Sequence, residues 1–233
     1  MTSDLHSRFQ GRTGAYLLRQ ERVVLSEILP TVFGFYLVQA GAWGPGHDLL
    51  QSSPIRSQLM LDPQADDANL RADPAYLPFA SDSVDAILLP HTLEYAADPY
   101  QVLREAERAL VGEGHLIVLG FHPWGPWGLR QRFVSSIPTR GRCVRAGRLR
   151  EWLSVLGFEI VCLRHYLFRP PLTRKALLVR SGFLDQWRWR VTAGAYMLAA
   201  RKRVLCLTPL RRQRLRPQRA FAGVIKPTTR EIV

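Results

Sequence analysis

Cysteine and long apolar runs are both scarce in this sequence. The 233 residues include only Cys143, Cys162 and Cys206, too few and too widely spaced for a disulfide framework or a CxxC metal site. The first twelve residues lack the apolar segment of a signal peptide, and no apolar run approaches the roughly 20 residues of a membrane-spanning helix. These absences predict a soluble, cytoplasmic protein that binds no metal.

Acidic residues are missing from one long stretch near the C-terminus. Residues 201–230 hold ten of the 32 Lys and Arg residues and no Asp or Glu, so they carry most of the net charge of +13. Two interpretations remain open for this segment. It is a solvated, flexible tail, or it attracts nucleic acid or an anionic membrane surface by Coulomb forces.

What the sequence does contain is an alternation of apolar and amphipathic segments. The apolar segments predict strands at 33–41, 57–63, 84–90, 115–121 and 158–168. Helical spacing of apolar residues predicts helices at 16–29, 99–110 and 147–158, the second capped by Asp98 and stopped by Gly112 and Gly114. Segment 193–203 fits a last strand or a short helix. This order predicts an α/β domain with a mainly parallel sheet, helices on both faces, and ligands at the carboxyl ends of the strands.

Glycines and carboxylates follow the first two predicted strands. Gly41, Gly44 and Gly46 would let backbone amides approach a ligand closely. Asp62 ends the second strand, where a carboxylate can accept both ribose hydroxyls of a nucleoside. Asp73, placed beside an adenine, would accept from its exocyclic amine. Plain turns are the alternative, because glycines favour tight turns and both aspartates precede a proline.

A series of short motifs follows in a fixed order between Asp73 and Leu116. They are Asp73, Leu77-Pro78-Phe79, Asp82–Ile87, His91–Tyr95, Asp98-Pro99, Leu103-Arg104-Glu105 and Leu110–Leu116. In this order they strongly resemble the methyltransferase type 11 family. The resemblance implies a Rossmann-like class I methyltransferase domain over residues 1–205, followed by a basic, flexible tail over 206–233. It also implies S-adenosylmethionine as the cofactor.

The resemblance assigns a role to each candidate residue of the cofactor site. Gly41, Gly44 and Gly46 would form the cofactor loop, Asp62 would bind the ribose hydroxyls and Asp73 the adenine amine. His91 would line the cofactor pocket on the side that faces the substrate.

The sequence departs from the family pattern in three places. Gln39 or Ala40 stands where an acidic residue usually precedes the glycines, and Trp43 is an extra residue in the glycine loop. Tyr95 replaces the usual histidine. Gly112-Glu113-Gly114 replaces Pro-Gly-Gly.

His91 and His122 are the candidate general bases, because each follows a strand at the ligand edge and histidine titrates near neutral pH. A structural or solvent-facing histidine is the alternative for both. Aromatic residues near the fourth strand would either wall an acceptor pocket or seal a core; they are Phe121, Trp124, Trp127 and Phe133.

We therefore expect an S-adenosylmethionine-dependent methyltransferase that acts on an unidentified small-molecule acceptor. The first alternative is an RNA-directed methyltransferase that uses the basic tail. The second is a non-catalytic relative that keeps the fold as a binding or regulatory protein.

Overall fold

The computed structural model describes residues 12–44, 46–123, 143–167 and 194–204. The helices are α2 (Arg12–Ile28), α3 (Thr92–Tyr95), α4 (Pro99–Ala109) and α6 (Ala146–Val155), with short 3-10 turns η1 (Leu29–Thr31) and η2 (Asp48–Leu50). The strands are β1 (Tyr36–Ala40), β2 (Ser57–Leu61), β3 (Val84–Pro90), β4 (Leu110–Phe121), β5 (Phe158–Tyr166) and β6 (Ala195–Lys202).

The six strands form one sheet in the order β2-β1-β3-β4-β6-β5. Strands β2, β1, β3 and β4 pair in parallel, which confirms the predicted mainly parallel sheet. Segment 193–203, left open between strand and helix, contributes β6, which runs antiparallel to both β4 and β5. Strand β5 is therefore parallel to β4, and five strands direct their carboxyl ends to one edge of the sheet.

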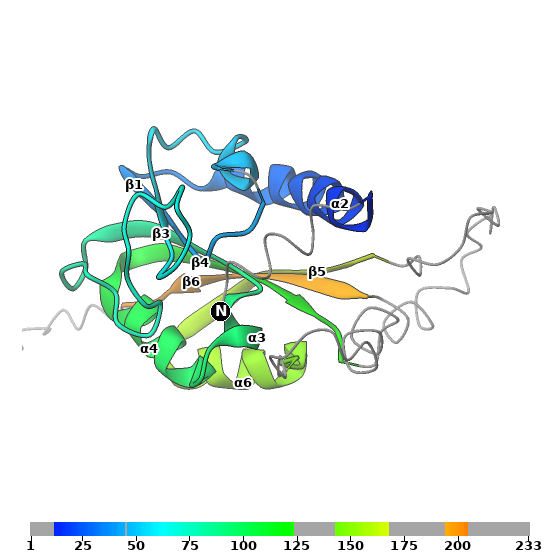
Figure 1. Ribbon diagram of the computed structural model, residues 1–233. Coiled ribbons are helices and arrows are strands. Elements are labelled where there is room, and N and C mark those ends of the chain that lie inside the picture. The colour runs from blue at the N-terminus through cyan, green and yellow to red at the C-terminus, as the bar shows by residue number, and fades with distance from the viewer. Residues whose placement is uncertain (1–11, 45, 124–142, 168–193, 205–233) are drawn as a thin grey trace, which may run out of the picture.

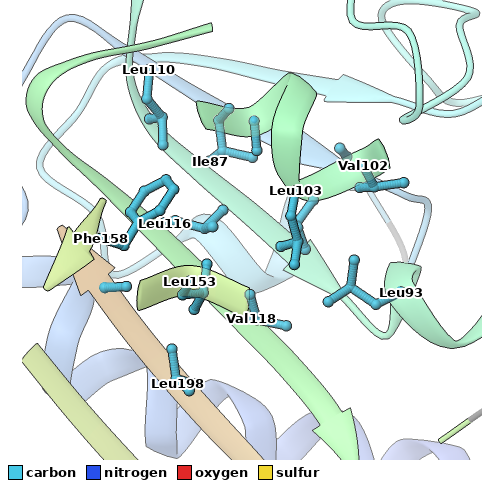
Figure 2. Close-up of a cluster of buried hydrophobic side chains, with 14 of the residues drawn as sticks. Ile87, Leu93, Val102, Leu103, Leu110, Leu116, Val118, Leu153, Phe158 and Leu198 are labelled. Carbon is cyan, nitrogen blue, oxygen red and sulfur yellow. The ribbon is translucent and has the colours of Figure 1, made fainter. Parts of the chain in front are cut away.

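Helices cover both faces of this sheet, with α2 on one side and α4 and α6 on the other (Figure 1). Successive strand residues point to opposite faces. Ala86 and Leu88 of β3 accordingly pack in the cluster under α2. Ile87 packs in the opposite cluster with Leu103 of α4 and Leu153 of α6 (Figure 2). Each fully buried leucine in these clusters contributes roughly 1.5–3 kcal/mol, so the two apolar layers fix the sheet that carries the site.

Helix α4 begins as predicted and ends earlier than predicted. The Asp98 carboxylate accepts the N–H groups of Tyr100 at 3.0 Å and Gln101 at 3.2 Å, which caps the helix. The helix ends at Ala109 and β4 begins at once, so Gly112 and Gly114 lie inside the strand and do not terminate the helix. At Gly114 a Cβ atom would lie 2.9 Å from a backbone oxygen, which explains the glycine.

No helix in the described ranges is both long and apolar enough to cross a membrane. The predicted boundary between residues 205 and 206, and almost all of the basic C-terminal segment, lie outside the described residues. The division into a domain and a tail therefore stays a prediction.

Candidate functional site

A cavity of about 240 Å³ lies at the carboxyl-end edge of the sheet, above β1, β2 and β3. Its walls come from the loops that follow these strands, which are residues 41–43 after β1, residues 62–64 and 73–74 after β2, and residues 90–97 after β3. The structure thus brings Gly41, Asp62, Asp73 and His91 to one place. This is the edge at which open α/β sheets bind ligands.

Asp62 ties two of these loops together. Its side chain is fully buried, and its Oδ2 accepts the N–H of Ala42 at 2.8 Å. Its Oδ1 accepts the N–H groups of Gln64 at 2.8 Å and Ala65 at 2.9 Å. Asp73 stands at another wall, is exposed, and accepts the N–H of Ala75 at 2.9 Å. One buried and one exposed carboxylate therefore face the same cavity.

The first glycine of the loop permits a close approach between β1 and α3. Gly41 has a φ of +112°, and a Cβ atom there would lie 2.7 Å from the Thr92 Oγ1. The Thr92 hydroxyl donates to the carbonyl of Ala40. Of the other two predicted glycines, Gly44 packs against Leu18, and Gly46 donates its N–H to Asp67 at 3.3 Å. Neither of these two is among the residues that line the cavity.

Gln39 occupies the position before the loop where the resemblance leads us to expect an acidic residue. Its side chain is buried, and its Nε2 donates to the carbonyl of Gly41 at 3.0 Å. Its Oε1 is also buried and has no hydrogen-bond partner among the described residues. The neutral amide of Gln39 therefore bonds to the first residue of the glycine loop.

His91 lies directly after β3 in the left-handed conformation, with a φ of +55°. Its ring is fully buried, and its Nε2 is 2.8 Å from Glu21 Oε1. Its Nδ1 is 3.6 Å from Glu94 Oε2, a separation that suits an ion pair but is too long for a hydrogen bond. The ring also stacks on Phe121 with a centroid distance of 4.1 Å, and it contacts the tilted ring of Trp43 with a centroid distance of 4.4 Å.

These surroundings set the charge of His91. Burial alone would lower the pKa of the imidazole, but Glu94 and Glu21 outweigh burial and raise the pKa to about 9. His91 is therefore a cation at neutral pH, held between two buried carboxylates. Its predicted role as a proton acceptor stays a prediction, and the geometry gives it an ion-pairing role in the wall of the cavity.

A second, wider hollow of about 1130 Å³ adjoins this cavity and shares Ala97 with it. Its lining comes from α4, α6 and the residues just before each helix, from β5, and from the residue after β4. It includes Tyr100, His122, Arg145, Arg148, Trp152 and His165. Burial and the nearby Arg145 both lower the pKa of His122, so this imidazole is neutral at pH 7. The structure therefore separates the two predicted bases into two compartments.

Of the four aromatic residues predicted to wall an acceptor pocket or seal a core, the structure describes Phe121. Phe121 is buried in the cluster under α2, where it belongs to the core. Trp124, Trp127 and Phe133 lie outside the described residues.

Comparison with known proteins identifies the fold and matches one segment of the chain to a family. Residues 55–118, which include β2, Asp62, Asp73 and His91, match the methyltransferase domain family. The chain has the fold of class I methyltransferases. The family match and the fold indicate an enzyme that uses S-adenosylmethionine as its cofactor.

Two solved structures share the fold of this methyltransferase. A SAM-dependent methyltransferase from Archaeoglobus fulgidus superposes with a TM-score of 0.60 at 17% identity, over 84% of this chain and 96% of that one. A putative methyltransferase from Haloferax volcanii, solved in complex with the Trm112 methyltransferase activator, has a TM-score of 0.58 at 18% identity, over 84% and 95%. The uncharacterized Escherichia coli protein YafS is 29% identical over 192 residues, which are 80% of this chain and 77% of YafS.

Glu21 is a buried residue beside the candidate site that sequence reasoning missed. It lies on α2, far from the matched segment, and its carboxylate contacts both His91 and Trp43. The available signal was its position between Leu17 and Leu25, where helical spacing places a carboxylate inside an apolar stripe. Trp43 was noticed as an extra loop residue, but its buried partner was not foreseen.

Proposed function

We propose that this methyltransferase transfers a methyl group to a small-molecule acceptor that binds in the arginine-lined hollow beside the cofactor cavity. The observation that carries this proposal is the contact between the two compartments at Ala97. S-adenosylmethionine, when bound, supplies an electrophilic methyl group on its sulfonium. The main task of the protein is then to align donor and acceptor.

The residues of the smaller cavity suit a nucleoside cofactor. Asp62 ends β2, where a carboxylate can accept ribose hydroxyls, and Asp73 stands at a separate wall, where it would accept from an adenine amine. Gly41 has no side chain to block the approach of a ligand to the loop backbone. Pro63 and Pro74 supply apolar surface between these polar groups.

The lining of the wider hollow favours a flat, anionic acceptor. Tyr100 and Trp152 make an edge-to-face pair with ring centroids 5.9 Å apart, and the Arg148 guanidinium lies 5.2 Å from the Trp152 ring centroid. Arg145 and Arg150 add positive charge to the same lining, and the three arginines outnumber its two carboxylates, Asp98 and Glu151. Aromatic faces bind planar molecules, and guanidinium groups pair with carboxylate or phosphate.

We assign the proton-accepting role to His122. Its imidazole is neutral at pH 7 and lies in the wider hollow, where an acceptor would bind. His91 is less suited to this role, because its ring is fully buried and its charge is already compensated by Glu21 and Glu94.

The test is S-adenosylhomocysteine release with a panel of small aromatic carboxylates and phosphates, run beside unfractionated transfer RNA. We expect turnover with at least one small molecule. For that acceptor, His122→Gln should lower kcat while leaving the Kd of the cofactor unchanged. Turnover with the RNA alone would contradict the proposal and favour the RNA-directed alternative.

A further inference from the structure

We propose that Glu21, on the helix that precedes β1, is a positioning residue of the cofactor site and acts through Trp43 and His91. This inference rests on the proposed function, because the cavity it concerns is the one assigned to S-adenosylmethionine. Glu21 itself is not among the residues that line that cavity, whereas Trp43 and His91 both are.

One carboxylate joins four parts of the chain. Glu21 Oε2 accepts the indole N–H of Trp43 at 2.6 Å, and Glu21 Oε1 lies 2.8 Å from His91 Nε2. The Tyr166 hydroxyl at the end of β5 donates to Oε1 at 3.4 Å. Helix α2 is thereby fastened to the loop after β1 and to the residue after β3, which form two walls of the cofactor cavity.

The burial of this carboxylate argues for a role beyond stability. Glu21 is fully buried, and its neighbours on the same helix stripe are the fully buried Leu17 and Leu25. An apolar residue would complete the stripe without the desolvation cost that a buried charge incurs. The chain instead places a carboxylate there, which pairs with His91 in one wall of the cavity and accepts a hydrogen bond from Trp43 in another.

The geometry of Trp43 shows how Glu21 reaches the loop. Trp43 is the extra residue of the glycine loop, and its ring is buried against His91. The hydrogen bond from its indole N–H to Glu21 fixes the ring. A second hydrogen bond, from the N–H of the adjacent Ala42 to Asp62, fixes the backbone of the loop. Weakening the Glu21 contact should let the loop depart from the conformation that accepts the cofactor.

Glu21→Gln tests the proposal, with Glu27→Gln as the matched control. Glu27 lies on the same helix, is half exposed and pairs with Arg164 at 3.6 Å, so the two changes are chemically identical. We expect Glu21→Gln to weaken binding of S-adenosylmethionine and S-adenosylhomocysteine alike, by about tenfold each, as for loss of a charge-assisted hydrogen bond. Glu27→Gln should stay within about twofold of the wild type.

Trp43→Phe provides a second variant that keeps an aromatic ring and removes only the indole donor. If Glu21 acts through Trp43, the two substitutions remove the same interaction. The fold-loss of S-adenosylhomocysteine affinity in the double variant Glu21→Gln/Trp43→Phe should then be smaller than the product of the fold-losses in the two single variants. A fold-loss in the double variant equal to that product would overturn the proposed coupling. Selective loss of S-adenosylmethionine would also overturn the positioning role, since it would mean that Glu21 senses the sulfonium charge directly.

The indole N–H resonance of Trp43, identified by its disappearance in Trp43→Phe, gives a readout in the absence of ligand. We expect Glu21→Gln to shift this resonance and Glu27→Gln to leave it in place. An unshifted resonance would overturn the positioning role even if the wild type binds the cofactor. Failure of the wild type to bind either cofactor form would instead overturn the proposed function, so the two failures can be told apart.

Discussion

The two adjoining compartments of this methyltransferase are built in opposite ways. The walls of the smaller cavity are bonded to one another through buried groups, with Asp62 joining the loops after β1 and β2, and Glu21 joining Trp43 to His91. The wider hollow is edged by exposed side chains such as Arg145 and Arg148. A cavity with bonded walls suits a cofactor that stays the same, whereas exposed walls can be changed without disturbing the core. Under the proposed function, the cofactor therefore belongs to the smaller cavity and the choice of acceptor to the wider hollow.

Loss of Asp62 should have the largest effect, because one side chain supports both the loops and the ligand. We expect Asp62→Ala to weaken cofactor binding by more than about a hundredfold, since several hydrogen bonds to a carboxylate are lost together. Equilibrium dialysis with S-adenosylhomocysteine would measure this loss, and thermal unfolding would check that the variant is folded. Asp66→Asn is the control, because Asp66 is exposed and forms an ion pair with Arg71 at 3.1 Å. Binding by Asp62→Ala at wild-type affinity would remove Asp62 from the site.

A second effect, on the stability of the fold, should appear when pH is raised through the pKa of His91. The folded-state pKa of His91 is raised from 6.5 to about 9. Its contribution to stability is therefore fully present below pH 6.5 and is lost as pH rises through 9, a change of about 3 kcal/mol. The groups that face the ring are Glu21 from α2 and Glu94 from α3, with Tyr166 beside Glu21.

Urea unfolding at pH 6 and pH 10 would measure this dependence, with His91→Gln for comparison. The variant should lose less stability than the wild type over that interval, because it lacks the group that releases its proton. The difference between the two proteins excludes other groups that titrate in the same range. Identical pH dependence in both would contradict the buried ion pair.

The smallest effect on the cofactor should come from the wider hollow. We expect Arg145→Gln to leave the Kd of S-adenosylhomocysteine within about twofold of the wild type, because Arg145 lines only that hollow. The same change should raise the pKa of His122, since the positive charge of Arg145 is one of the two causes that lower it. An NMR titration of the His122 ring would follow the pKa. A large loss of cofactor affinity would show that the two compartments are not independent.

The sequence predicted the parts of the fold that depend on local signals. Apolar runs marked β3 and β4 because strands covered on both faces are continuously apolar, and Asp98-Pro99 marked the start of α4. The sequence pointed to Gly41 and Asp62 because each follows a strand directly, and to Asp73 because it precedes Pro74 and the Leu77-Pro78-Phe79 turn. The end of α4 was misplaced, because pairing of Leu110 with Val84 of β3 ends the helix before the glycines do.

The rest depended on contacts between distant residues. Glu21 and His91 are 70 positions apart, and only the packing of α2 on the sheet brings their side chains to 2.8 Å. The charge of His91 likewise follows from two carboxylates whose proximity no local pattern reveals. His91 and His122 follow the neighbouring strands β3 and β4, yet they line different compartments, and no local sequence pattern indicates this separation.

Calorimetric titration of the wild-type protein with S-adenosylhomocysteine tests the central claim most directly. The claim is that the bonded cavity above β1, β2 and β3 is the cofactor site. It predicts binding of one molecule per chain with a micromolar Kd. A folded protein that takes up no S-adenosylhomocysteine would contradict the assignment of this cavity and, with it, the proposed methyl transfer.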